Sequence, residues 1–146
     1  MADEGVREGC TFCRIIDGGL EADVVIDEPH AVAFLDHRPL FPGHVLVTPR
    51  EHVGTLPEVP GALLGPLFET VQRVARAVPE ALGAQGTFVA INNVVSQSVP
   101  HLHVHVVPRT KGDGLRGFFW PRTPYDDDAH RRSVAEQLRQ TLAASR

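Results

Sequence analysis

The sequence predicts an α+β domain with a five-stranded, mainly antiparallel sheet, one main helix and a C-terminal helix. Three patterns support this fold class. Short stretches rich in β-branched and apolar residues alternate with turn residues, which is typical of strands. One long segment repeats its apolar residues every three to four positions, and the end of the chain has a second repeat of that kind, which is typical of amphipathic helices.

Five stretches have the composition of strands, because valine, isoleucine and phenylalanine dominate them and most are bounded by turn residues. They are Ala22–Asp27, Ala31–Leu35, His44–Thr48, Thr87–Asn92 and Val99–Val107. Proline lacks the backbone donor that a sheet needs, so we expect Pro49 and Pro108 to end the third and fifth strands.

The main helix is expected over Gly61–Val78, where Leu67 and Val71 belong to a continuous apolar face. Pro79 and Gly83 are expected to end it, since proline disturbs a helix interior and glycine favours a helix C-terminus.

The C-terminal helix is expected over Ala129–Ala143, with Val134, Leu138 and Leu142 on one face. The acidic run Asp126–Asp128 precedes it. We expect this run to cap the helix rather than to bind a metal.

Composition limits the class of protein. The chain has 146 residues, 42% of them apolar, and a net charge of −4, which excludes the basic footprint of a nucleic-acid binder. We expect a flexible segment over 1–9 and a single domain over 10–146. With two cysteines, no signal peptide and no long apolar run, the expected location is the cytoplasm, with no membrane partner.

The most informative stretch carries His101, His103 and His105 at alternate positions. Alternate side chains of a strand share one face, so the three imidazoles are expected to lie together. Such a face has three interpretations: a polar surface without a role, a metal site, or a site where one imidazole attacks phosphorus. The pattern alone does not choose, but Gln97 and Ser98 just before the strand are neutral hydrogen-bonding groups that suit phosphate oxygens and bind zinc poorly.

These residues resemble the histidine-triad (HIT) family of nucleotide hydrolases and transferases. The family signature is His-x-His-x-His followed by apolar residues, and Phe34-Leu35-Asp36 and the run from Pro42 to His52 are also similar to the family. The similarity covers about residues 10–113, which implies the HIT fold. In the family's transferring branches glutamine usually replaces the third histidine, so His105 favours a hydrolase.

The resemblance implies roles for individual residues. His103 matches the nucleophile, which forms a nucleotidyl-histidine that water cleaves, and His105 matches a histidine that binds phosphate. Gln97 and Ser98 match residues that contact the phosphate or the leaving group. The nucleotide-binding residues are expected to be these two together with Phe12, Ile15, Phe34, Asp36, His44 and Asn92. Asn93 is a rival for Asn92, and the apolar members have the plain alternative of core packing.

The expected activity is cleavage of a phosphate bond next to a nucleoside. Candidate substrates are dinucleoside polyphosphates, nucleoside phosphoramidates and adenylates. The alternative is a nucleotide-binding regulatory or adaptor protein with little turnover. No magnesium-binding carboxylate cluster or phosphate-binding glycine-lysine loop is evident, and the triad chemistry is expected to need no cofactor. Family resemblance also implies a homodimer.

Cys10 and Cys13 have the spacing of a zinc knuckle, but two thiolates alone do not complete a structural zinc site. The pair has a redox pair or a chance occurrence as alternatives. In one branch of the HIT family two histidines complete the site, and the matching positions are His52 and His101. The resemblance therefore implies a structural zinc ion at these four residues, which would remove His101 from phosphate chemistry.

Two segments depart from the family or carry no clear role. Many relatives have a glycine-rich loop where this chain has Asn93-Val94-Val95-Ser96, so the phosphate-loop geometry is open. The glycine-rich and aromatic segment 112–122 is expected to pack as a loop, with a substrate-pocket role for Arg116 or Arg122 as the alternative.

Overall fold

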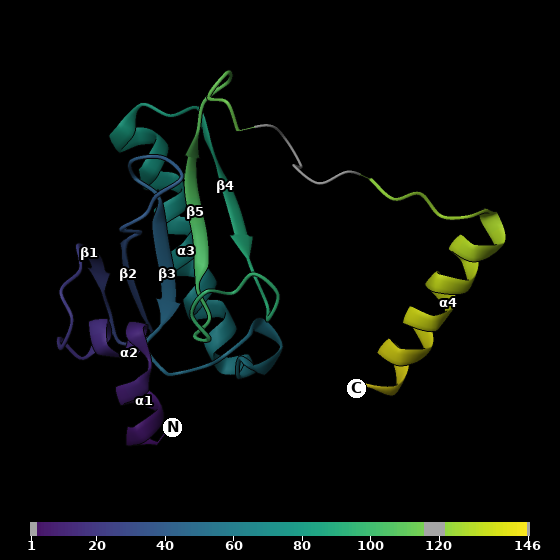
Figure 1. Cartoon of the computed structure of the whole chain (residues 1–146), viewed down its shortest axis with the longest axis horizontal. Helices are drawn as coiled ribbons and strands as arrows, with labels where there is room; N and C mark the ends of the chain where they lie inside the picture. The colour runs from purple at the N-terminus through teal and green to yellow at the C-terminus, as the bar shows by residue number, and fades with distance from the viewer. Residues whose placement is uncertain (1–2, 116–121, 146) are drawn as a thin grey trace. The chain divides into compact units, whose positions relative to one another are not determined.

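A computed structural model describes residues 3–115 and 122–145 of the chain (Figure 1). The chain divides into two compact units, Met1–Asp113 and Gly114–Arg146, which are described separately. The single domain over 10–146 stays a prediction. Within the described ranges, none of the helices combines the length and apolarity that a membrane crossing requires.

The first unit is built on a five-stranded antiparallel sheet with the strand order β1-β2-β3-β5-β4 (Figure 1). The strands are β1 (Val24–Asp27), β2 (Ala31–Leu35), β3 (Val45–Pro49), β4 (Gly86–Ile91) and β5 (Val104–Arg109). The predicted fold class is therefore confirmed, and the first four predicted strands agree with the structure to within two residues at each end.

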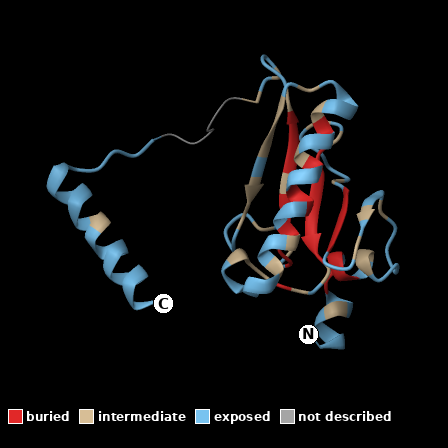
Figure 2. Ribbon diagram, turned by 180° about the vertical axis from the view of Figure 1, so that it is seen from behind, coloured by how far each residue is buried: buried red, intermediate tan, exposed pale blue. Residues whose placement is uncertain are grey.

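One face of the sheet is covered by α3 (Gly61–Leu82), whose buried residues include Leu67, Val71 and Val74. They form one core with inward residues of the strands. Figure 2 shows the buried central strands behind a helix whose outer side is exposed. The expectation that Pro79 ends this helix is wrong. Proline obstructs the turn before it rather than the residues after it. The helix continues to Leu82 and is capped by Gly83, where φ is +70°.

The opposite face of the sheet is covered by α2 (Thr11–Ile16), which follows α1 (Glu4–Gly9). Alternation along β2 explains the two layers, because Val32 and Phe34 pack with Phe12 whereas Ala31 and Ala33 join the core under α3. Sequence reasoning missed both short helices. Each is one and a half turns long, too short for an apolar repeat to be visible.

The predicted strand Val99–Val107 needs a correction. Pro108 does not end the strand, because Pro108 and Arg109 still pair with β4. β5 runs from Val104 to Arg109, so His105 lies in the strand while His101 and His103 precede it. At this point the chain has left its partner β3, and the Leu102 N–H instead donates to the Val53 carbonyl at 2.7 Å. The alternation nevertheless extends through this segment, because the intervening residues Leu102, Val104 and Val106 all pack into the core under α3.

The second unit contains α4 (Asp128–Ala144), the predicted C-terminal helix. Asp127 caps it by accepting a hydrogen bond from the His130 N–H at 2.7 Å, as expected of the acidic run. Most of the predicted aromatic segment, residues 116–121 with Arg116, lies outside the described residues.

The first unit also contains the short 3-10 helix η1 (Leu56–Glu58).

Candidate active site and metal centre

A cleft of about 580 Å³ lies between α2 and the sheet face that bears the histidines. It brings together seven of the residues predicted to act on a nucleotide: Phe12, Ile15, Phe34, Asp36, Ser98, His103 and His105. The Phe12 ring meets the His103 ring edge-on at 4.9 Å between centroids, so the α2 side of the cleft touches the predicted nucleophile directly.

The tautomer of His103 is set by a backbone group. Its Nδ1 lies 2.8 Å from the His101 carbonyl oxygen. A carbonyl can only accept, so Nδ1 carries the proton and Nε2 carries a lone pair. His103 is 3% exposed yet lines the cleft. The structure therefore provides one imidazole with a free nucleophilic nitrogen at the cleft wall.

His105 has the opposite tautomer, also because of a backbone group. The Leu40 N–H donates to His44 Nδ1 at 3.1 Å, so a neutral His44 carries its proton on Nε2. That Nε2 lies 2.9 Å from Nδ1 of His105, which must accept. The remaining proton of His105 is on its Nε2, so His105 presents a hydrogen-bond donor where His103 presents a lone pair.

Burial keeps these imidazoles neutral. Burial lowers the pKa of His103 below its usual 6.5, against the hydrogen bond to the His101 carbonyl and the Asp36 charge, which raise it. Burial, followed by the charges of His103 and His44, lowers the pKa of His105 to about 4. Burial also lowers the pKa of His44, although the nearby Asp36 opposes this. At neutral pH the tautomers derived above therefore apply.

Three predicted residues lie elsewhere. His44 is buried behind His105 rather than in the cleft lining, and it contacts the site through that ring. The Gln97 amide donates to the Gly54 carbonyl at 2.7 Å and accepts from the Val94 N–H at 3.1 Å, so it braces two loops. Asn92 follows β4, half-buried and outside the cleft lining. Its rival Asn93 accepts a hydrogen bond from the Leu56 N–H at 2.8 Å.

Sequence reasoning missed other parts of the cleft lining. Leu20, Leu46 and Val99 add apolar surface, and Glu21 and Asp23 add carboxylates. Leu46 could have been found, because it pairs directly with His105 once β3 and β5 are aligned. The residues between α2 and β1 carry no sequence pattern that would place them here.

A second cluster joins the four predicted metal ligands. The ligand atoms of Cys10, Cys13, His52 and His101 lie within 4.8 Å of one another. His101 Nδ1 is 3.5 Å from the Cys10 sulfur and 3.4 Å from the Cys13 sulfur, and His52 Nδ1 is 3.4 Å from the Cys13 sulfur. Zinc–sulfur and zinc–nitrogen bonds at tetrahedral angles separate sulfur from nitrogen by about 3.5 Å. The donor set and its spacing thus fit a tetrahedral zinc ion.

The protonation of the cluster has two parts. His101 Nε2 lies 2.9 Å from the Pro49 carbonyl, which fixes the proton there and leaves Nδ1 as a lone pair facing the sulfurs. Burial lowers the pKa of His101 to about 4. Burial and the neighbouring Cys10 raise the pKa of Cys13 to about 12, against the charge of Arg7. A bound cation would deprotonate the thiols.

His101 connects the two sites. Its side chain belongs to the cysteine–histidine cluster, while its carbonyl accepts a hydrogen bond from the His103 ring. The same residue is fully buried. Any shift of the His101 backbone would therefore move the hydrogen-bond partner of the His103 ring.

Comparisons with known proteins identify the family. The model of the HIT domain matches residues 18–112. The Bacillus subtilis protein named hit is 34% identical over 94% of this chain and 97% of its own length. The adenosine 5′-monophosphoramidase of Schizosaccharomyces pombe is 30% identical over 79% of this chain and 85% of its own. The crystal structure of a zinc-bound histidine triad family protein from Mycobacterium smegmatis is 34% identical, covers 92% of this chain and 99% of its own, and has a TM-score of 0.71. The chain belongs to the HIT family.

The loop before the triad is strained, which yields a stability prediction. Val94 has φ of +69° and is 75% exposed, whereas its neighbour Val95 is 78% exposed without positive φ. A β-branched residue in the left-handed region costs about 1–2 kcal/mol, and asparagine tolerates that region. Val94→Asn should raise the free energy of unfolding by about 1 kcal/mol in urea denaturation. Val95→Asn is the matched control and should change little; equal effects of both variants would contradict the assigned strain.

Proposed function

We propose that this protein is a cytoplasmic nucleotide hydrolase that cleaves a phosphate bond next to a nucleoside through a covalent intermediate on His103. The observation that carries the proposal is the 2.8 Å hydrogen bond from His103 Nδ1 to the His101 carbonyl, because it leaves Nε2 as a nucleophile at the wall of a cleft. Burial supports the same role by favouring the neutral, nucleophilic ring.

The reaction has two displacements. The Nε2 lone pair of His103 attacks the phosphorus bonded to the nucleoside, and the bond from phosphorus to the leaving group breaks. The leaving group departs with that electron pair and takes a proton from solvent. Water then attacks the same phosphorus, the nitrogen–phosphorus bond breaks, and a proton returns to solvent. The nucleoside monophosphate leaves and His103 is regenerated.

The surrounding groups stabilise charge in both steps. The His101 carbonyl faces the proton on Nδ1 and favours the positive ring of the nucleotidyl-histidine. His105 offers its Nε2–H to a phosphate oxygen, and the Ser98 hydroxyl from the cleft lining offers a second donor. Apolar Phe12, Ile15 and Phe34 suit a base, and Asp36 suits ribose hydroxyls. Gln97 and Asn92 remain proposed phosphate contacts that would have to reorient to reach it.

A named relative indicates which of the candidate substrates to test first. The relative from Schizosaccharomyces pombe is named as an adenosine monophosphoramidase, which supports a nucleoside phosphoramidate as the first substrate to test. Dinucleoside polyphosphates and adenylates share the reacting phosphorus and remain alternatives. A nucleotide-binding regulatory or adaptor protein with little turnover is the second candidate. The observation that favours it concerns Gln97. Both hydrogen bonds of its amide go to backbone groups of loops, so the amide is not free to contact a phosphate.

We further propose a structural zinc ion held by Cys10, Cys13, His52 and His101. When bound, it would supply a crosslink between α2, the segment after β3 and the start of the triad, with no part in the bond-breaking steps. The zinc-bound relative from Mycobacterium smegmatis supports the proposal. A homodimer is also proposed, and exposed apolar residues Leu64 and Phe68 on α3 are suitable for its interface.

His103→Ala removes the nucleophile. Turnover of an adenosine phosphoramidate is measured by the release of adenosine monophosphate. It should fall on the order of 10⁴-fold or more. Binding of adenosine monophosphate by calorimetry should persist. His30→Ala, an exposed histidine in the turn between β1 and β2, is the control and should keep full activity. Undiminished turnover in His103→Ala would reject the mechanism, and binding by the wild type without turnover would favour the adaptor.

The pH profile follows from the lowered pKa of His103. Only the neutral ring attacks, and a folded-state pKa below 6.5 means that it stays neutral as the pH falls through 6.5. We expect kcat/KM to be flat across this range and to decrease only at more acid pH. Circular dichroism at each pH separates titration from unfolding. A decrease of kcat/KM that begins above pH 6.5 would contradict a His103 pKa lowered by burial.

Metal content tests the zinc proposal. Atomic emission should find about one zinc ion per chain, and a strong chelator should lower the melting temperature by about 10 °C, since ligand binding to the native state alone contributes several kcal/mol. The double variant Cys10→Ser, Cys13→Ser should contain no zinc and melt at the same temperature with or without chelator. A wild-type protein that ignores the chelator would refute the structural role.

A further inference from the structure

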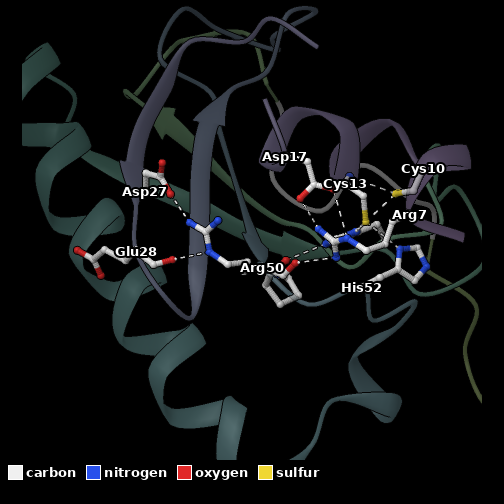
Figure 3. A network of polar contacts seen from close by, with 10 residues as sticks. Arg7, Cys10, Cys13, Asp17, Asp27, Glu28, Arg50 and His52 are labelled. Atoms are coloured by element: carbon white, nitrogen blue, oxygen red, sulfur yellow. Dashed lines mark hydrogen bonds and ion pairs between the residues drawn. The ribbon is translucent and has the colours of Figure 1, made fainter. Parts of the chain in front are cut away.

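Arg7 of α1 joins two segments that are far apart in the sequence (Figure 3). Its guanidinium forms two bonds to the Asp17 carboxylate, from Nη2 at 2.7 Å and from Nε at 3.3 Å. Its Nη1 donates to the Arg50 carbonyl at 3.4 Å. One side chain therefore links the N-terminal helix, the end of α2 and the residue directly after β3.

The three linked positions flank the metal ligands. Arg7 precedes Cys10 by three residues, Asp17 follows Cys13 by four, and Arg50 precedes His52 by two. These are short spans of chain, so fixing their ends limits how far the two sulfurs and the His52 ring can separate. Figure 3 shows Arg7 beside the cysteines and His52.

Arg50 extends the linkage into the sheet. Its guanidinium pairs with the Asp27 carboxylate and donates from Nε to the Glu28 carbonyl at 3.0 Å. Both acceptors lie at the end of β1 and the turn that follows (Figure 3). The residue whose carbonyl Arg7 contacts is thus held to the end of β1 and the following turn by its own side chain.

Arg7 also lines a hollow beside the cluster. A hollow of about 740 Å³ opens beside His52, and Arg7, Asp17 and Arg50 are part of its lining. The Arg7 side chain is only 25% exposed. Arg7 and Asp17 therefore belong to the wall of the hollow beside the cluster, and the Arg7 side chain is largely covered there.

We propose that Arg7, together with Asp17, is a positioning residue that holds the ligand-bearing segments of the Cys10, Cys13, His52 and His101 cluster around a zinc ion. This inference rests on the proposed zinc site and not on the proposed hydrolase activity. If Arg7 and Asp17 formed only a surface ion pair, the pair would contribute little to stability or to zinc affinity. Groups that hydrogen-bond directly to metal ligands typically change metal affinity 10- to 100-fold. Arg7 acts one step further out, on the segments that carry the ligands, so we expect the lower end of that range, which still differs from the effect of a surface ion pair.

Zinc affinity, measured by competition with a chromogenic chelator on the full chain, tests the proposal. Arg7→Gln and Asp17→Asn should each weaken zinc binding by about 10-fold, the lower end of the effect of groups bonded directly to ligands. The double variant should be no weaker than the worse single variant, because both remove the same link. Arg7→Lys keeps the charge without the two-pronged contact and should give an intermediate affinity.

The matched control is Arg14→Gln. Arg14 lies on α2 and lines the same hollow, but within the described residues its side chain makes no hydrogen bond or ion pair. The zinc affinity of the Arg14→Gln variant should stay within about twofold of that of the wild type. Melting of the metal-free proteins serves as a folding check, and the Arg7 and Asp17 variants should melt close to the metal-free wild type.

Four results would overturn the proposal. They are unchanged zinc affinity in Arg7→Gln, an equal loss in Arg14→Gln, strictly additive losses in the double variant, and a large loss of metal-free stability that accounts for the weaker binding. A wild-type protein that takes up no zinc would refute the zinc site itself and this inference with it. Failure of the hydrolase assay has no bearing on any of these readouts.

Discussion

The site depends on one hydrogen bond, from His103 Nδ1 to the carbonyl of His101. A backbone carbonyl cannot donate, so the bond determines which ring nitrogen is free. Without it the buried ring could exchange tautomers, and its reactive nitrogen would be protonated for part of the time. The sheet contributes by fixing the carbonyl: Leu102 is fully buried under α3, and its N–H is bound to Val53.

Backbone groups act in the same way on the whole triad. Each of the three imidazoles has its tautomer set, directly or through one neighbour, by a backbone group: the Pro49 carbonyl for His101, the His101 carbonyl for His103, and the Leu40 N–H acting through His44 for His105. The results differ, giving a lone pair toward the sulfurs, a lone pair in the cleft and a donor in the cleft. Identical side chains thus acquire three chemical roles from their local backbone, and burial keeps all three rings neutral.

Much of this arrangement could be predicted from the sequence. Alternation correctly placed Leu102, Val104 and Val106 opposite the histidines, and the long apolar repeat found α3, because both patterns reflect burial of one face. The cysteine spacing and family resemblance selected four residues that the structure brings together. The start of β5 was wrong because it depends on where pairing with β3 and β4 stops, at Val47 and Ile91, which composition does not reveal. Gln97 was expected at the phosphate, but its amide binds loop carbonyl and N–H groups whose positions only the fold defines. Arg7 carried no signal, since its partners are 10 and 43 residues away.

Nitrogen-15 NMR of the histidine rings at pH 7.5, with two-bond correlations to the ring protons, tests the central claim most directly. We expect His103 to be neutral with its proton on Nδ1 and His105 to be neutral with its proton on Nε2, in the same sample. Assignment follows from single His103→Gln and His105→Gln variants. A His103 ring protonated on Nε2, or one that averages between both nitrogens, would contradict the account.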